Sequence, residues 1–328
     1  MKILILTHAE VEELLPVREC IPVMAEALAD LARGNAYQPL RMIVRPPGAK
    51  GDMALMPSYR SGERAAYGVK TVCFFPDNPA RGLDSHQGSV MLFSAETGEL
   101  LALMNASAIT AIRTAAVSGV ATQLLASKDA GDLAIIGSGV QARSHIEAMA
   151  CARTIKRARI ASFRFENARK FADEFGRRYS FPIEPVDNVE SAVRGADLIV
   201  TATTAAEPIL KLEWISPGAH MNVVGSSIPT TRELDGATIA AASLFVDRRE
   251  STINEGGEYL FALREGAIGP DHIRAEIGEL LIGAKPGRAS ADEITVFKSL
   301  GLAVEDLASA AYLYHKAADH QAGTWVEY

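Results

Sequence analysis

The sequence predicts an α/β protein that combines a doubly wound parallel sheet with a smaller α+β portion. Beyond residue 129, short apolar runs alternate with helical segments, which is typical of parallel strands covered by helices on both faces. Residues 40–104 show β-branched and aromatic runs cut by turns, which favours antiparallel or mixed strand pairing. At 328 residues the chain is longer than single domains usually are, so two domains are expected.

The smaller portion begins with a strand and two helices. A strand is predicted at 2–6, and Thr7 with Glu10 forms a capping-box pattern that begins a helix. Apolar residues at helical spacing over 23–31 predict a second helix, which Gly34 ends. Further strands are predicted at 41–44, 53–56, 67–75 and 90–94, the last in a hairpin with 100–104, and a long alanine-rich helix at 108–125.

The larger portion repeats strand, turn and helix. A final helix at 303–318 is expected to return to the smaller portion. The first domain is therefore predicted at 1–118 together with 304–328, and the second at 119–303. The strands of the second domain are predicted at 133–136, 158–163, 198–201, 221–224, 244–246 and 294–297.

Composition narrows the class of protein. A hydrophobic content of 48% with 22% charged residues is typical of a globular enzyme, and a net charge of −7 disfavours nucleic acid as a partner. The cysteines Cys20, Cys73 and Cys151 have no CxxC spacing, so neither disulfides nor a metal site is expected. The first apolar run is short and is soon followed by charged residues, which argues against a signal peptide. No stretch of about 18 consecutive apolar residues occurs, which argues against a membrane span. A cytoplasmic location is expected.

A glycine-rich turn follows the first strand of the second domain. LAII at 133–136 runs into GSGVQA at 137–142 and then into a helical stretch. Gly137 permits the tight turn, Gly139 lets a pyrophosphate approach the backbone, and Ala142 allows close helix packing. With a strand before it and a helix after it, this turn predicts a Rossmann dinucleotide site, although the pattern alone also occurs in ordinary strand-to-helix turns.

The next strand bears on the choice of dinucleotide. A site for NAD usually has an acidic residue about 20 positions past the glycines. Here Ser162 and Arg164 follow the strand, and no carboxylate occurs before Glu166. A hydroxyl and a guanidinium suit a 2′-phosphate, so NADP(H) is favoured and NAD(H) is possible. Alternatively, Arg164 is a solvated residue at the start of a helix.

Three cations interrupt apolar stretches of the first domain: Arg41, Lys70 and Arg113. A charge in the middle of a strand or in an apolar helix is costly unless it is paired or bound. Together these side chains could hold a substrate carboxylate. Taken singly, each could equally be an ion-pair partner or a cation that reaches solvent.

Motifs along nearly the whole chain resemble those of the ornithine cyclodeaminase/mu-crystallin family. They are QPLR at 38–41, LMP at 55–57, SHQ at 85–87, RTAA at 113–116, GSGVQA at 137–142, EPIL at 207–210, PGAH at 217–220 and VFKSLG at 296–301.

The resemblance implies a substrate-binding, homodimer-forming first domain joined to a Rossmann domain. It also implies that Arg41, Lys70 and Arg113 bind the carboxylate of a small imino or amino acid, with Lys70 as the candidate catalytic residue. The residues that it implies for the dinucleotide are Ser85, His86, Thr114, Gly137, Gly139, Val140, Gln141, Ser162, Arg164, Thr203, Val224, Ser226 and Ser299.

Two departures from the family's cyclodeaminases favour an imine reductase. Those enzymes carry an Asp where this chain has Ser226, and an acidic residue for the distal amine where it has Ala54. The expected reaction is NAD(P)H-dependent reduction of a cyclic 2-imino acid, 1-pyrroline-2-carboxylate or 1-piperideine-2-carboxylate, to proline or pipecolate. This reaction depends on orientation more than on a general base, so a site with three cations and no catalytic carboxylate is expected to suffice.

Other functions stay open at this point. An amino-acid dehydrogenase or an N-alkyl amino acid-forming reductase would use the same fold. An ornithine cyclodeaminase and a non-catalytic, NADPH-dependent small-ligand-binding protein are further alternatives.

Overall fold

The computed structural model describes residues 2–328, with the side chain of Pro79 left aside. The chain forms two compact units, one of residues up to Arg113 with Leu302–Tyr328, and one of Thr114–Gly301. The boundaries predicted from the sequence, 118/119 and 303/304, lie a few residues further along the chain. The first boundary falls inside helix α3 (Ala106–Leu125).

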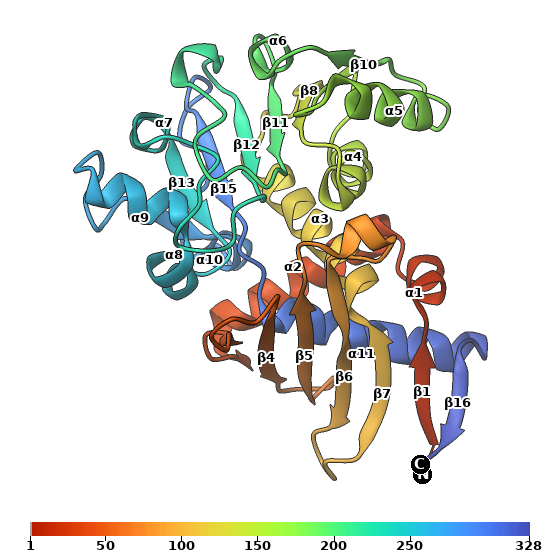
Figure 1. The fold of residues 1–328 in the computed structure, drawn as a ribbon. Helices are drawn as coiled ribbons and strands as arrows, with labels where there is room; N and C mark the ends of the chain where they lie inside the picture. Colours follow the sequence, from red (N-terminus) through yellow and green to blue (C-terminus); the bar gives the residue numbers. More distant parts are fainter. Residues whose placement is uncertain (1) are drawn as a thin grey trace. The chain divides into compact units, whose positions relative to one another are not determined.

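The first unit contains a mixed eight-stranded sheet, visible in Figure 1. Its strand order is β16-β1-β7-β6-β5-β4-β2, and β3 pairs with β4. Pairing is antiparallel except between β1 and β7. The strands are β1 (Lys2–Leu6), β2 (Ala36–Tyr37), β3 (Met42–Val44), β4 (Asp52–Arg60), β5 (Ala66–Phe74), β6 (His86–Ser94), β7 (Leu100–Asn105) and β16 (Thr324–Glu327).

The helices of this unit follow the predicted signals. Helix α1 (His8–Leu14) has the capping box of Thr7 and Glu10, and α2 (Val17–Arg33) ends at Gly34 in the left-handed conformation. The 3-10 helix η1 spans Asn78–Arg81.

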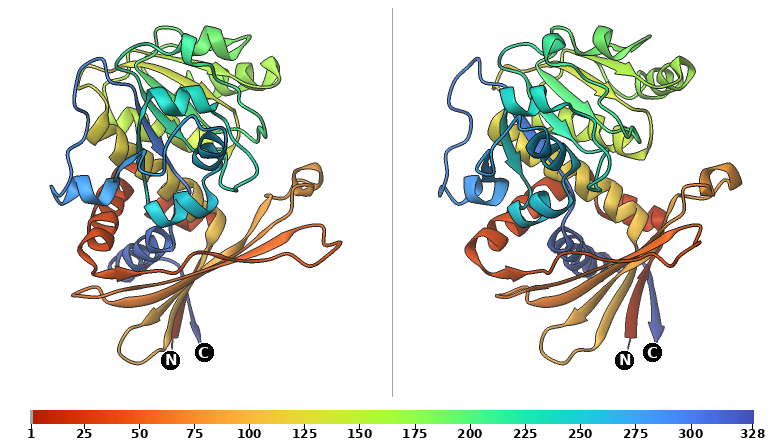
Figure 2. Two further views of the ribbon diagram at one scale, coloured as in Figure 1. Left: turned by 90° about the vertical axis from the view of Figure 1, so that its left-hand side faces the viewer. Right: turned by 60° about the vertical axis from the view of Figure 1, so that its left-hand side comes forward.

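The last helix, α11 (Ala303–His320), lies along one face of the sheet (Figure 2). A Cβ at Gly68 would lie 2.9 Å from Leu307 Cδ1, so the glycine lets helix and sheet approach closely. The predicted return of this helix to the first unit is confirmed.

Helix α3 is predominantly apolar and has no separate polar face. By length and composition it could cross a membrane, but 83% of the window that passes this test is buried inside the protein. A helix with this pattern is typical of a protein interior.

The second unit contains an eight-stranded sheet in which every pairing is parallel, as predicted. Its order is β10-β9-β8-β11-β12-β15-β13-β14. The strands are β8 (Asp132–Ile136), β9 (Arg157–Ala161), β10 (Ile183–Val186), β11 (Leu198–Thr201), β12 (His220–Val223), β13 (Ser243–Val246), β14 (Ile273–Glu276) and β15 (Thr295–Lys298).

The sequence did not predict β10 and β14, which are the two edge strands. Their sequences, IEPV and IRAE, lack a continuous apolar run because edge strands have less contact with the core.

Short helices connect these strands. They are α4 (Val140–Ala152), α5 (Phe165–Phe175), α6 (Val189–Val193), η2 (Leu212–Trp214), α7 (Gly236–Ala241), α8 (Arg249–Glu255), α9 (Gly257–Arg264) and α10 (Ile277–Leu281). The neighbouring strands β8, β11, β12 and β15 are parallel, so their carboxyl ends meet at one edge. That edge is where open α/β sheets bind ligands.

Candidate functional site

The glycine turn after β8 has the shape that a phosphate site needs. Gly137 has φ of +120°, and a Cβ there would lie 2.3 Å from the carbonyl oxygen of Ala202. Gly139 is the N-cap of α4 and provides no side-chain cap, and a Cβ on it would meet no atom within 4 Å. The open space at Gly139 and the first N–H groups of α4 fit a dinucleotide pyrophosphate, which they would hold.

Helix α4 is fixed from behind by a buried histidine. His145 Nε2 lies 2.9 Å from Ser118 Oγ, and Nδ1 lies 2.7 Å from the Gln141 carbonyl oxygen. Burial lowers the pKa of His145 to about 4, so the ring is neutral near pH 7. This histidine orients the helix that carries the predicted contacts Val140 and Gln141.

The end of β9 lies beside the glycine turn. Ser162 Oγ is 2.8 Å from Ser138 Oγ, which links the two segments. Arg164 is exposed at the N-cap position of α5 and makes no side-chain cap bond. The next acidic residue, Glu166, pairs with Arg169 at 3.0 Å. The predicted residues Ser162 and Arg164 therefore both follow β9, and the Ser162 hydroxyl contacts the glycine turn.

A buried carboxylate joins the ends of β11 and β12. Glu233 accepts hydrogen bonds from Thr201 Oγ1 at 2.7 Å, from the N–H and hydroxyl of Thr203 at 2.8 Å each, and from the Gly225 N–H at 2.8 Å. Burial is the main influence on the pKa of Glu233 and raises it, while Lys298 acts in the opposite direction. With four donors bound, this carboxylate is a fixed acceptor that holds the predicted contact Thr203.

A second buried pair extends this network to β15. Lys298 Nζ lies 2.9 Å from Glu258 Oε2, and Glu258 Oε1 accepts from the Glu233 N–H at 2.9 Å. Lys298 also donates to the Ser226 carbonyl oxygen. Sequence reasoning missed all three of these charged residues, because only the packed sheet brings them together.

Ser226 uses its hydroxyl within its own loop. Ser226 Oγ lies 2.6 Å from the Thr231 carbonyl oxygen and 2.7 Å from Thr231 Oγ1, and the residue is buried. Two other predicted contacts, Val224 and Ser299, are held by backbone hydrogen bonds to the sheet. The Val224 N–H donates to the Thr201 carbonyl oxygen, and the Ser299 N–H donates to the Val223 carbonyl oxygen. Dinucleotide contacts by these residues stay a prediction.

Lys70 and Arg113 of the first unit meet at a pair of acidic residues on α11. Asp306 Oδ2 lies 2.7 Å from Lys70 Nζ, and Asp306 Oδ1 accepts from Arg113 Nε at 3.0 Å. Glu305 Oε2 accepts from Arg113 Nη1 at 2.9 Å. At most 4% of the surface of any of these four residues is exposed, so this is a buried, hydrogen-bonded charge cluster.

Burial tunes the charges of this cluster. It lowers the pKa of Lys70 to about 8, since desolvation outweighs the attraction of Asp306, and Arg113 and Arg41 act in the same direction as burial. Burial raises the pKa of Asp306, but Arg113 and Lys70 outweigh this effect and the net pKa is lowered. Lys70 is thus an ammonium that can release a proton near neutral pH, beside an ionised carboxylate.

Lys70 and Arg113 are therefore brought together, and they meet two carboxylates, those of Glu305 and Asp306, that the sequence reasoning did not include. The expectation that the reaction needs no catalytic carboxylate stays a prediction. Lys70, Arg113 and Arg41, whose charge is near enough to lower the pKa of Lys70, carry three formal positive charges against the two negative charges of Glu305 and Asp306. This leaves one net positive charge, which suits one substrate carboxylate. Ser85 and His86 lie at the start of β6 in the same unit, and Ser85 Oγ is 3.1 Å from His86 Nδ1. Desolvation is the main cause that lowers the pKa of His86, and the positive charge of Lys70 lowers it further.

The predicted contact Thr114 follows Arg113 in α3 and is buried.

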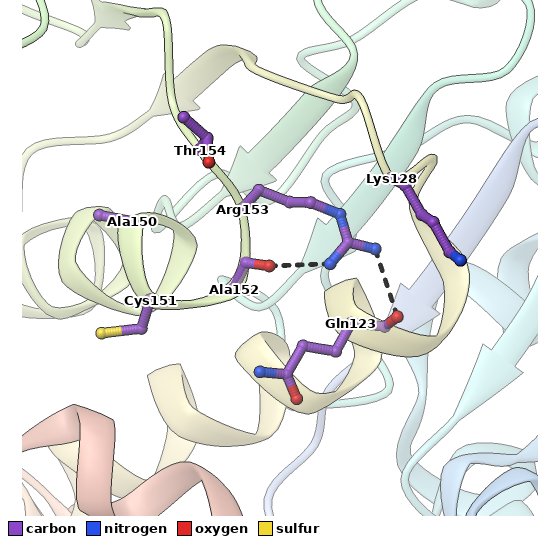
Figure 3. Close-up of a pocket in the computed structure, with 7 residues that line it drawn as sticks. All are labelled: Gln123, Lys128, Ala150, Cys151, Ala152, Arg153 and Thr154. Atoms are coloured by element: carbon purple, nitrogen blue, oxygen red, sulfur yellow. Dashed lines mark hydrogen bonds between the residues drawn. The ribbon is translucent and has the colours of Figure 1, made fainter.

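A separate hollow of about 520 Å³ occurs at the carboxyl end of α3 and is lined by Lys128, Cys151 and Arg153 among others (Figure 3). Arg153 donates to the carbonyl oxygens of Thr122, Gln123, Ala126, Ser127 and Ala152. Its guanidinium caps α3 and is fully engaged by the backbone. This hollow contains none of the predicted site residues.

A model of the ornithine cyclodeaminase/mu-crystallin family matches residues 1–321. The chain belongs to this family.

Members of the family resemble the chain over almost its full length. The ketimine reductase mu-crystallin of Mus musculus is 42% identical over 297 residues, which cover 90% of each protein. The structure of Thermococcus litoralis Delta(1)-pyrroline-2-carboxylate reductase in complex with NADH and L-proline is 40% identical. It has a TM-score of 0.95 and covers 98% of this chain and 99% of that chain.

An archaeal alanine dehydrogenase dimer with bound NAD is 34% identical, with a TM-score of 0.94 and coverage of 100% of both chains. The predicted family and fold class are confirmed by these matches. Within the ornithine cyclodeaminase/mu-crystallin family, the two named complexes hold NADH or NAD, so neither supports a preference for NADP(H).

Proposed function

We propose that this protein is an oxidoreductase that reduces a cyclic 2-imino acid, 1-pyrroline-2-carboxylate or 1-piperideine-2-carboxylate, to the corresponding L-amino acid with NAD(P)H. The observation that carries the proposal is the buried Lys70 ammonium, 2.7 Å from Asp306, with Arg113 on the same carboxylate. The charge of Arg41 also acts on the pKa of Lys70. A group that can donate a proton near pH 8 and cations for a carboxylate are what reduction of a carboxylated imine requires.

The residues of the first unit have distinct roles in this reaction. Arg41 and Arg113 bind the substrate carboxylate, and Arg113 is held in place by the carboxylates of Glu305 and Asp306. Lys70 holds the proton that the ring nitrogen accepts when the imine arrives neutral. A reduced nicotinamide, when bound, supplies the hydride for C2.

The same site geometry favours NADPH over NADH. Ser162 offers a hydroxyl beside the glycine turn, and Arg164 offers an exposed guanidinium two residues later. No acidic residue occurs in the segment from Ser162 to Arg164. A carboxylate at this place would repel the 2′-phosphate, whereas a guanidinium attracts it. NADPH is therefore the proposed cofactor, and NADH a weaker one.

The second candidate is an alanine-type amino-acid dehydrogenase, because the archaeal relative with that name is 34% identical over the whole chain. An N-alkyl amino acid-forming reductase, an ornithine cyclodeaminase and a non-catalytic, NADPH-dependent ligand-binding protein are the remaining alternatives. All of them share the dinucleotide turn.

One panel of NADPH-depletion assays separates these functions. The substrates are the five- and six-membered cyclic 2-imino acids, pyruvate with ammonia or methylamine, and ornithine with NAD⁺. The proposal expects the highest kcat/KM with a cyclic imino acid. A higher value with pyruvate and ammonia would establish the dehydrogenase instead, and cofactor binding without any turnover would indicate a binding protein.

A homodimer that forms through the sheet of the first unit is also proposed. Gly68 and Lys70 of β5 face α11, so Tyr67 and Val69 face the opposite side of the sheet. Tyr67 is 51% exposed, and the centroid of its ring lies 4.7 Å from that of Tyr59. Phe93 on β6 is paired with Tyr67 across the sheet. Exposed apolar side chains gathered on a sheet face are typical of a protein contact.

Light scattering after size-exclusion chromatography tests the dimer. The wild-type protein is expected to elute with twice the mass of the 35.1 kDa chain, and Tyr67→Asp with a lower mass. A monomeric wild-type protein would disprove this assembly. A reducing, cytoplasmic setting is also proposed, since no disulfide joins Cys20, Cys73 and Cys151 in the part of the chain that the structure describes.

A further inference from the structure

We propose that Asp306 is a positioning residue for imine reduction, which holds Lys70 and Arg113 in one arrangement and keeps the Lys70 ammonium available as the proton donor. The inference rests on the proposed function and adds a residue to it. Its basis is that one carboxylate contacts both cations through different oxygens, Oδ2 to Lys70 and Oδ1 to Arg113.

Burial strengthens the effect of the Asp306 charge on Lys70 and Arg113. Asp306 is 1% exposed, so its charge is not screened by water, and loss of the carboxylate would leave two neighbouring cations facing each other. Lys70 Nζ also lies 3.4 Å from Thr110 Oγ1. Two partners in fixed directions orient an ammonium group, whose remaining N–H can then point to a substrate nitrogen.

Asp306 also has the strongest favourable influence on the Lys70 charge. The charged groups around Lys70 come from several elements: Asp306 on α11, Arg113 on α3, Arg41 before β3, and His86 on β6. Of these, Asp306 is the one that raises the pKa of Lys70, whereas Arg113 and Arg41 lower it. Glu305, the neighbouring acid of the cluster, bonds to Arg113.

The chemical step balances with Lys70 as the acid. A hydride from the reduced nicotinamide forms the new C–H bond at C2 as the C=N π bond breaks, and the Lys70 proton forms the N–H bond. Lys70 is left as a neutral amine that water reprotonates. Without Asp306, the Lys70 proton is lost at lower pH, so the alkaline limit of the reaction moves down.

The test compares pH profiles of kcat/KM for the wild-type protein, Asp306→Asn and Glu305→Gln. The profile reports the free enzyme and the free substrate, and the substrate is common to all three. For Asp306→Asn we expect the alkaline midpoint to fall by about one pH unit or more, the usual effect of one neighbouring charge. For Glu305→Gln we expect a higher KM but an unchanged midpoint. An unchanged midpoint and KM in Asp306→Asn would overturn the proposal.

Asp306→Glu keeps the test decisive if Asp306→Asn does not fold. This variant retains the charge but displaces it, so the midpoint should stay near the wild-type value while kcat falls at least tenfold. Wild-type kcat and KM in Asp306→Glu would show that the position of the carboxylate has no effect on catalysis.

A readout that needs no turnover separates this proposal from the proposed function. In protein labelled with ¹³C at lysine Cε, the Lys70 signal is the one missing from Lys70→Met. Its titration midpoint is expected at lower pH in Asp306→Asn than in wild type. If the wild-type protein reduces no imine, the proposed function fails while this midpoint still tests Asp306; equal midpoints would refute its effect on Lys70.

Discussion

Glu233 accepts a hydrogen bond from the backbone N–H of Gly225 at 2.8 Å and another from Thr201 Oγ1 at 2.7 Å. These two bonds link the ends of the parallel strands β12 and β11. A Cβ on Gly225 would lie 2.4 Å from Glu233 Oε1, so the close approach requires glycine. The same carboxylate bonds to Thr203 beside the turn at Gly137, whose Cβ position is blocked by Ala202. One buried acid therefore orders the edge of the sheet that would hold the dinucleotide.

Replacement of Glu233 should lower the stability of this edge of the sheet. In Glu233→Gln, one oxygen becomes an NH₂ group that cannot accept from Thr203 or Gly225, so the free energy of unfolding should fall by about 1–3 kcal/mol. Dinucleotide affinity, measured by fluorescence titration, should fall too. The matched control is Glu166→Gln, an exposed partner of Arg169. Equal stability in the two variants would contradict the role given to Glu233.

Arg164→Ala should weaken NADPH binding selectively. Arg164 is exposed at the start of α5, and loss of one charge-assisted phosphate contact costs about 1.5–3 kcal/mol. The dissociation constants for NADPH and NADH decide the matter. Arg169→Ala, a cation on the same helix, serves as the control and should leave both constants near wild type. An equal loss for both cofactors in Arg164→Ala would remove Arg164 from the phosphate site.

Arg41→Ala should lower kcat/KM for the imino acid without much loss of stability, because Arg41 is only half-buried. Arg113→Ala should lower both, since Glu305 and Asp306 would keep their charges without that partner; breaking a buried pair costs about 3–5 kcal/mol. Steady-state kinetics and denaturant unfolding measure the two effects. Arg45→Ala, which loses only the exposed pair with Asp52, is the control. Wild-type kcat/KM in Arg41→Ala would show that it does not bind substrate.

Lys70 should make folding stability depend on pH. Its pKa is about 8 in the folded chain and near 10.5 when unfolded, so between these values the unfolded chain binds the extra proton. Stability contributed by this residue therefore rises with pH through that window. The test compares the unfolding free energies of wild type and Lys70→Met, because the other titrating groups are common to both proteins. From pH 8 to 10.5 the unfolding free energy of wild type should rise relative to that of Lys70→Met. A flat difference would mean that burial does not shift Lys70.

The protein should not convert ornithine to proline at a useful rate. Ser226 cannot take up a proton near neutral pH, its hydroxyl is bound to Thr231, and Ala54 offers no anion for an ammonium group. Loss of a general acid/base typically removes about 10² to 10⁴ in rate. Proline and ammonia are assayed after incubation with ornithine and NAD⁺. Turnover that matches the cyclic-imine reductase rate would show that the reductase assignment is wrong.

The sequence by itself determined the elements that depend on local pattern. Helical spacing and short apolar or β-branched runs predicted the longer helices and most strands, and the GSGVQA turn predicted the dinucleotide edge. All these signals lie within a few neighbouring residues. Arg41, Lys70 and Arg113 were predicted as substrate-binding residues because each interrupts an apolar stretch and because the family resemblance implies this role for them.

Only the tertiary structure decided which charges meet. Asp306 meets Lys70 because α11 packs on the sheet that carries Lys70, and Arg113, 193 residues from Asp306 in the sequence, contacts the same carboxylate. In sequence, Glu305 and Asp306 look like acids that stabilise the start of a helix, a place where exposed acids are common. Burial turns them into partners of two cations, and burial depends on the packing of distant segments rather than on local pattern.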